Sequence, residues 1–185
     1  AIPIFWTIMT HKGEECYRRV FEFLKQKIPT FNPSSYMSDF EFGLHNAIKD
    51  VFPNIDANHC HFHYAQALIN KSTEIGLINK TTIRPGTHPE IYIVVKQLIA
   101  LALLPPNLIK ITFENIKRVT METFGNHFDG LFGYYERYWL KTVKPEGFSI
   151  YNLRDDRTNN HIESYHRTLN MHLRKNPHPN QFFCK

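Results

Sequence analysis

The chain has 185 residues, 42% of them hydrophobic and 14% aromatic, so it can build an apolar core and is not a wholly disordered protein. Its three cysteines, Cys16, Cys60 and Cys184, are too few and too widely spaced for a secreted disulfide scaffold, which favours a reducing compartment. The net charge of +5 is compatible with a phosphate-rich partner, although many unrelated domains share it.

The first half of the chain alternates between strand and helix patterns. β-branched and aromatic residues predict a buried strand over residues 2–9, and two further short strands are expected over 35–39 and 58–62. Apolar residues at three- and four-residue spacing predict helices over 13–28, 40–52 and 63–77. This alternation is typical of an α/β layer architecture.

The second half looks helical. Residues 89–140 show no strand alternation, although the β-branched run "IYIVV" leaves a strand possible at 91–95. We therefore predict an α/β core in residues 1–85, an all-helical insertion in 86–150, and a last core helix within 151–185. The apolar run that ends at Pro105 and Pro106 is too short to span a bilayer, so no membrane partner is expected.

Asp39 allows two interpretations. Ser38 and Glu41 fit a capping box, which would place Asp39 in the first turn of a helix, where its charge favours the helix dipole. Alternatively, Asp39 ends a strand at the edge of the sheet where open α/β proteins bind their ligands. A carboxylate at that edge can bind a divalent metal ion.

Glu163 also allows two interpretations. It lies one turn into the last predicted helix, with His166 and Arg167 on the same face. It could pair with Arg167 on an exposed helix. It could equally be a second carboxylate of the site, with His166 and Arg167 as contacts to phosphates.

Cys60 and His63 form a C-x2-H pattern. A structural zinc site needs a second pair of ligands, and none of comparable spacing follows, so zinc is not expected. On a strand, His61 and His63 would face the same side of the sheet.

Together these segments resemble the Mutator-like element (MULE) transposase domain. The resemblance rests on "SDFE", "GLHNAIKDVFP", "CHFHYAQAL", "LIALALLPP" and "RTNNHIESYHRTLN", in that order, and it covers nearly the whole chain. It implies an RNase H-like fold with a DDE triad of metal-binding carboxylates. Asp39 matches the second Asp, Glu163 matches the Glu, and Cys60 and His63 match a family pattern of unassigned role.

The resemblance further implies two Mg²⁺ or Mn²⁺ ions, phosphodiester cleavage and DNA strand transfer in the nucleus. Transposon ends and target DNA would be the partners, and a homo-oligomer is compatible with the family. The first catalytic Asp would lie upstream of Ala1, so we expect a fragment that is inactive alone, cut at the N-terminus and also at the C-terminus. A domesticated, non-catalytic DNA-binding or regulatory protein derived from a transposase is the alternative.

Overall fold

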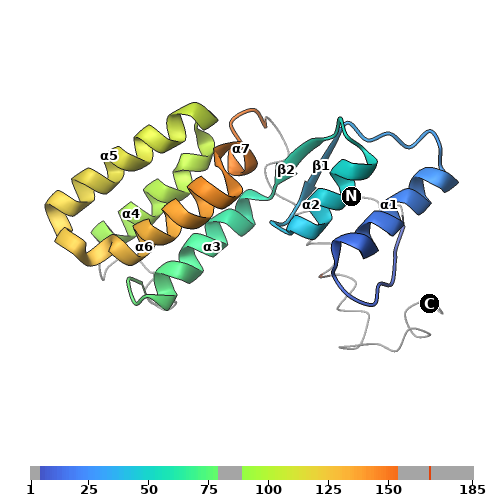
Figure 1. Cartoon of the computed structure of the whole chain (residues 1–185). Coiled ribbons are helices and arrows are strands. Elements are labelled where there is room, and N and C mark those ends of the chain that lie inside the picture. The colour runs from blue at the N-terminus through green and yellow to red at the C-terminus, as the bar shows by residue number, and fades with distance from the viewer. Residues whose placement is uncertain (1–4, 79–88, 154–166, 168–185) are drawn as a thin grey trace.

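The computed structural model describes residues 5–78, 89–153 and 167. Its elements form two groups (Figure 1). The strands β1 (Ser35–Ser38) and β2 (Asp56–His59) lie with the helices α1 (Glu14–Lys27) and α2 (Phe42–Val51). The helix α3 (His61–Glu74) leaves β2 and runs into a separate helical group.

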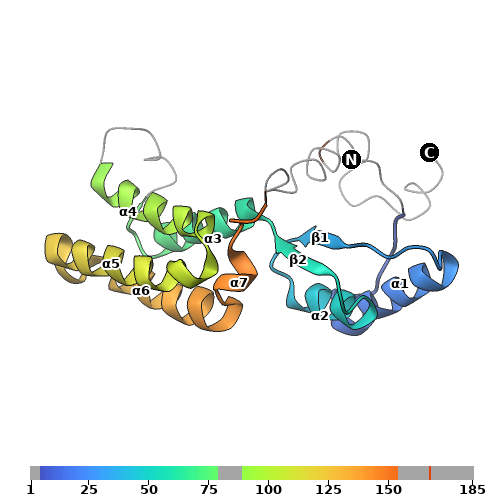
Figure 2. The same ribbon diagram turned by 90° about the horizontal axis from the view of Figure 1, so that it is seen from above.

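The two strands form a parallel sheet. Ser35 pairs with Asp56 at one end, and Ser38 pairs with His59 at the other. Helix α2 provides the crossover that a parallel pair requires. Figure 2 shows α1 and α2 on one face of this sheet. A small apolar cluster fills the space there, made of Ile48, Val51, Phe52 and Ile55, with Phe21, Phe31 and Tyr36 packed against it.

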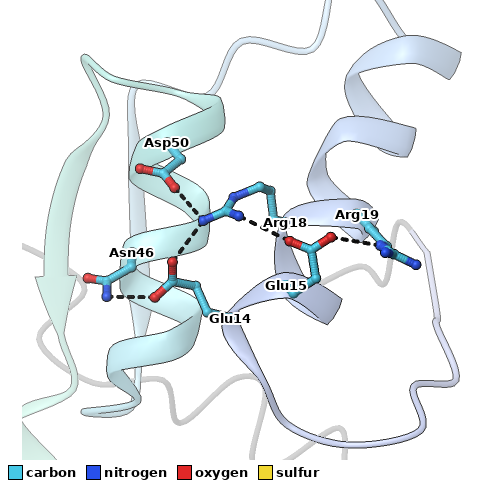
Figure 3. A network of polar contacts seen from close by, with 6 residues as sticks. All are labelled: Glu14, Glu15, Arg18, Arg19, Asn46 and Asp50. Atoms are coloured by element: carbon cyan, nitrogen blue, oxygen red, sulfur yellow. Dashed lines mark hydrogen bonds and ion pairs between the residues drawn. The ribbon is translucent and has the colours of Figure 1, made fainter.

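A polar network joins α1 to α2 (Figure 3). The Arg18 guanidinium donates to Glu14 and Asp50 at 2.7 Å each and to Glu15 at 3.0 Å. Asn46 of α2 donates to the second oxygen of Glu14 at 2.9 Å. Because Asp50 and Asn46 lie on α2, the network fixes the two helices against each other beneath the sheet.

The helical group contains the larger core. Besides α3 it comprises α4 (Pro89–Ala100), η1 (Leu101–Leu103), α5 (Pro106–Phe124), η2 (Gly125–Phe128), α6 (Asp129–Tyr134), the π-helix η3 (Tyr135–Val143) and α7 (Pro145–Phe148). Its fully buried side chains include Trp139, Tyr64, Tyr135, Phe113 and Phe128. Residues 91–95 are helical in α4, so the strand that the β-branched run left possible does not form.

Two other expectations are corrected. Residues 5–9 form no strand, and Phe5, Trp6 and Ile8 are exposed, because no described strand pairs with this segment. The third predicted strand is Asp56–His59 rather than 58–62, so His61 and His63 lie in the first turn of α3. The fold is a helix-rich α/β arrangement with a small parallel sheet. No helix in the described ranges is both long enough and apolar enough to cross a membrane.

A buried pair of tyrosines links three segments of the helical group. The Tyr64 hydroxyl donates to the backbone oxygen of Leu98 at 2.6 Å and lies 2.9 Å from the Tyr135 hydroxyl. Since a carbonyl oxygen can only accept, Tyr64 gives its proton to Leu98, and Tyr135 donates to Tyr64. Burial raises the pKa of both phenols well above their usual value, so both stay protonated at neutral pH.

We expect Tyr64→Phe to lower the free energy of unfolding by about 1–3 kcal/mol, since it leaves the buried Tyr135 hydroxyl and Leu98 oxygen with one partner fewer. Urea unfolding followed by circular dichroism measures the change. The matched control is Tyr151→Phe, at an exposed tyrosine, which should leave stability nearly unchanged. Equal stability of Tyr64→Phe and the unmodified chain would contradict the assigned hydrogen bonds.

Candidate functional site

Asp39 directly follows β1 at the carboxyl end of the parallel sheet. The backbone N–H of Cys60 donates to the Ser38 oxygen at 2.9 Å, so the ends of β1 and β2 are held together at this edge. The Asp39 side chain is 53% exposed, which leaves its carboxylate accessible to solvent. Such an edge is where open α/β sheets place their ligand sites.

The predicted capping box does not form. Ser38 belongs to β1, and its hydroxyl donates to the Asp39 backbone oxygen at 3.0 Å. Glu41 is the N-cap of α2 without a side-chain capping bond. Instead its carboxylate accepts from the Tyr17 hydroxyl at 2.7 Å and lies 3.6 Å from the Lys12 ammonium. Burial, together with the bond to Glu41, raises the pKa of Tyr17 to about 12.

Asp39 therefore does not start the helix. Helix α2 begins at Phe42, so Asp39 lies outside its first turn. The interpretation that Asp39 compensates the dipole of this helix is wrong. The position at the end of the strand, the other interpretation of the sequence, agrees with the structure.

The C-x2-H pattern lies beside Asp39. Cys60 is fully buried at the junction of β2 and α3. His63, in the first turn of α3, places its Nδ1 atom 3.0 Å from Oδ1 of Asp39. From the sequence the role of Cys60 and His63 stayed open, and no spacing signal indicated this contact. It arises because the two strands are parallel and bring Asp39 and the start of α3 to the same edge.

A row of aromatic and histidine rings lies next to Asp39 and extends into the helical group. Phe40 stacks on His59 with ring centroids 4.6 Å apart, and His59 stacks on His45 at 5.3 Å. On its other side Phe40 meets Trp139 of η3 edge to face at 4.9 Å. Phe40, His59 and Trp139 were not among the predicted site residues. Of these three residues, Phe40 alone had a sequence signal, because it directly follows Asp39 in the chain.

The histidines of this row are uncharged at neutral pH. Burial, and for His59 also the nearby His45, lowers the pKa of both rings. Charged Lys49 lowers that of His45 further. The His45 Nδ1 atom lies 2.5 Å from the Tyr36 hydroxyl, and burial raises the pKa of Tyr36 to about 12. The row therefore supplies shape beside Asp39 and adds no positive charge at pH 7.

The remaining predicted site residues lie mostly outside the described ranges. Glu163 and His166 are not among the described residues, so their position relative to Asp39 stays a prediction. Arg167 is described as an exposed residue. Within residues 5–78 and 89–153, no three His, Cys, Asp or Glu side chains form a group that could hold a metal ion. The domain boundaries and the metal ligands remain predictions as well.

The fold and the site define an α/β protein with an accessible carboxylate at the ligand-binding edge of a parallel sheet. The comparison with protein families is more particular: the model of the MULE transposase domain matches residues 1–67. The match contains the whole sheet unit, Asp39, Cys60 and His63, and it ends within α3.

The resemblance to this family is confirmed over that segment, which is transposase-related. The resemblance in the sequence motifs extends further than this match, to the last predicted helix. Neither the curated proteins nor the solved structures contain a match to the chain.

Proposed function

We propose that the chain is part of the catalytic domain of a MULE-type DNA transposase with an RNase H-like fold. The observation that carries this proposal is Asp39, which lies accessible at the carboxyl end of β1 within the segment that matches the family. The intact protein would cut phosphodiester bonds and transfer a DNA strand in the nucleus. Its partners would be the transposon ends and the target DNA, and a homo-oligomer is compatible with this role.

Asp39 is suited to Mg²⁺ or Mn²⁺. These hard ions prefer oxygen ligands, and a half-exposed carboxylate at a sheet edge offers them. Asp39 and Glu163 would be two of the three carboxylates of the triad, and an Asp upstream of Ala1 would be the third. When bound, a pair of such ions would supply activation of the attacking water or 3′-hydroxyl and charge stabilisation at the leaving oxygen.

The protein's own residues would position the substrate and the carboxylate. Basic side chains, with His166 and Arg167 as candidates, would contact the DNA phosphates, which fixes the backbone without reading the sequence. The row of rings from His45 to Trp139 would support the backbone next to Asp39. Cleavage needs no covalent bond between protein and DNA in this scheme.

The exposed segment 5–9 supports the proposed architecture. In an RNase H-like sheet, the strand with the first Asp and the hairpin strand after it would lie between this segment and β1. Phe5, Trp6 and Ile8 are apolar and exposed, as expected for a segment whose partner strand is absent from the described structure.

The proposal is tested by a plasmid-nicking assay on two proteins. The 185-residue chain should not nick DNA in Mg²⁺, since the proposal assigns only two of the three carboxylates, Asp39 and Glu163, to it. A protein extended upstream through a strand with an Asp should nick DNA, and EDTA should abolish this activity. DNA binding by the extended protein that needs no metal, with no nicking under any condition, would instead identify a non-catalytic DNA-binding regulator. Mg²⁺-dependent nicking by the 185-residue chain would contradict the claim that cleavage needs a third carboxylate from an upstream strand.

A further inference from the structure

We propose that the C-x2-H pattern is a positioning device for Asp39, in which His63 orients the carboxylate and Cys60 fixes the helix that holds His63. This inference gives a role to a motif that the proposed function leaves unassigned. It rests on that function only for its catalytic consequence. The geometry on which it is built stands without any metal ion.

The first step is the anchoring of α3. The Cys60 backbone N–H donates to the Ser38 oxygen at 2.9 Å, one residue before Asp39. The Cys60 side chain is completely buried, where a small apolar thiol fits the junction between β2 and α3. The start of α3 is therefore fixed to the end of β1 by a backbone hydrogen bond and by the packing of the buried Cys60 side chain.

The second step is the spacing. The backbone N–H of His63 donates to the Cys60 oxygen at 3.1 Å, which closes the first turn of α3. A residue three positions after Cys60 lies about one turn along the helix, on the same face, so its side chain points back toward the strand end. This is why the Nδ1 atom of His63 comes within 3.0 Å of Oδ1 of Asp39.

The third step is the chemistry of the contact. The two atoms lie at ion-pair distance, 3.0 Å apart, so a proton on Nδ1 of His63 would attract the ionised carboxylate of Asp39. A half-exposed Asp side chain would otherwise sample several rotamers. An imidazole held this close by a fixed helix favours one orientation of the carboxylate before any ion binds, and such preorganisation is how supporting residues tune metal ligands.

The first test is structural and needs no metal. In ¹⁵N-labelled 185-residue protein, we expect the His63 ring to show a protonated Nδ1, and Asp39→Asn should shift the resonance of that nitrogen. An unchanged His63 resonance in Asp39→Asn would overturn the proposal. The control is His127, an exposed residue of η2 whose ring resonances should not move.

The second test separates the two nitrogens of His63 with two amide variants. The amide nitrogen of Asn takes nearly the place of Nδ1, whereas that of Gln reaches nearly the place of Nε2. We titrate Mn²⁺ and follow the paramagnetic broadening of the backbone amides of residues 39–41. In His63→Asn, these amide signals should broaden at about the same Mn²⁺ concentration as in the unmodified chain. In His63→Gln, the same broadening should need about 10–100 times more Mn²⁺.

The outcomes distinguish this inference from the proposed function. If Asp39→Asn abolishes the broadening and His63→Gln behaves like His63→Asn, the positioning role is wrong and the metal site stands. If Mn²⁺ broadens no amide near Asp39 in the unmodified chain, the proposed metal site is wrong. Binding of Zn²⁺ that requires both Cys60 and His63 would overturn the positioning role in favour of a zinc half-site.

Discussion

Replacement of Asp39 by Asn should lower the Mg²⁺-dependent cleavage rate of the intact protein by at least about 100-fold. Asn has nearly the same shape as Asp but lacks the negative charge and is a poorer ligand for a hard ion. Loss of a residue that only supports a ligand already costs about 10–100-fold, so loss of the ligand itself should cost more. The measurement is single-turnover cleavage of labelled DNA in the extended protein.

Asp56→Asn is the matched control for this variant. Asp56 is exposed and lies at the opposite, amino end of the same sheet, where Ser35 is its partner. The Asp56→Asn variant should cleave DNA at the same rate as the unmodified protein. Both variants should unfold at the same temperature as the unmodified protein. If Asp39→Asn kept full activity, Asp39 would not be a metal ligand, and the structural contact with His63 would need another explanation.

Local periodicity predicted the helices well because each has one clearly apolar face. Leu24 of α1 and Ala47, Ile48 and Val51 of α2 point inward as their spacing predicts. Predictions that depended on a distant partner were less successful. Glu41 does not cap with Ser38, because the buried Tyr17 hydroxyl, on another helix, takes its carboxylate. The segment 5–9 has the composition of a strand, but a strand also needs an edge to pair with.

The site was predictable only in part, for the same reason. The position of Asp39 at the end of a strand follows from the order of the elements, which the sequence shows. The contact with His63 depends on where β2 ends, and the residues of "NHCHF" have no clear preference that would place this boundary. The support of Phe40 by Trp139 joins residues far apart in the chain, and no local pattern contains it.

Replacement of Trp139 by Ala should have the largest effect on stability in the helical group. Its side chain is 1% exposed and packs edge to face against Phe40, Tyr64, Tyr138 and Phe148. Removal of so large a buried ring typically costs about 3–5 kcal/mol, because a cavity remains. Urea unfolding should show this loss, and Trp139→Phe, which keeps a ring in place, should lose clearly less.

The Trp139 variants also test whether the helical group supports Asp39. Phe40 is held between His59 and Trp139, and it directly follows Asp39 in the chain. If this support matters, Trp139→Phe should remain folded yet shift the backbone amide resonances of Asp39 and Phe40. Another fully buried ring, Phe113 of α5, provides the control, since Phe113→Leu should lower stability without moving those resonances. Unchanged Asp39 and Phe40 signals in Trp139→Phe would mean that the sheet edge keeps its geometry without the helical group.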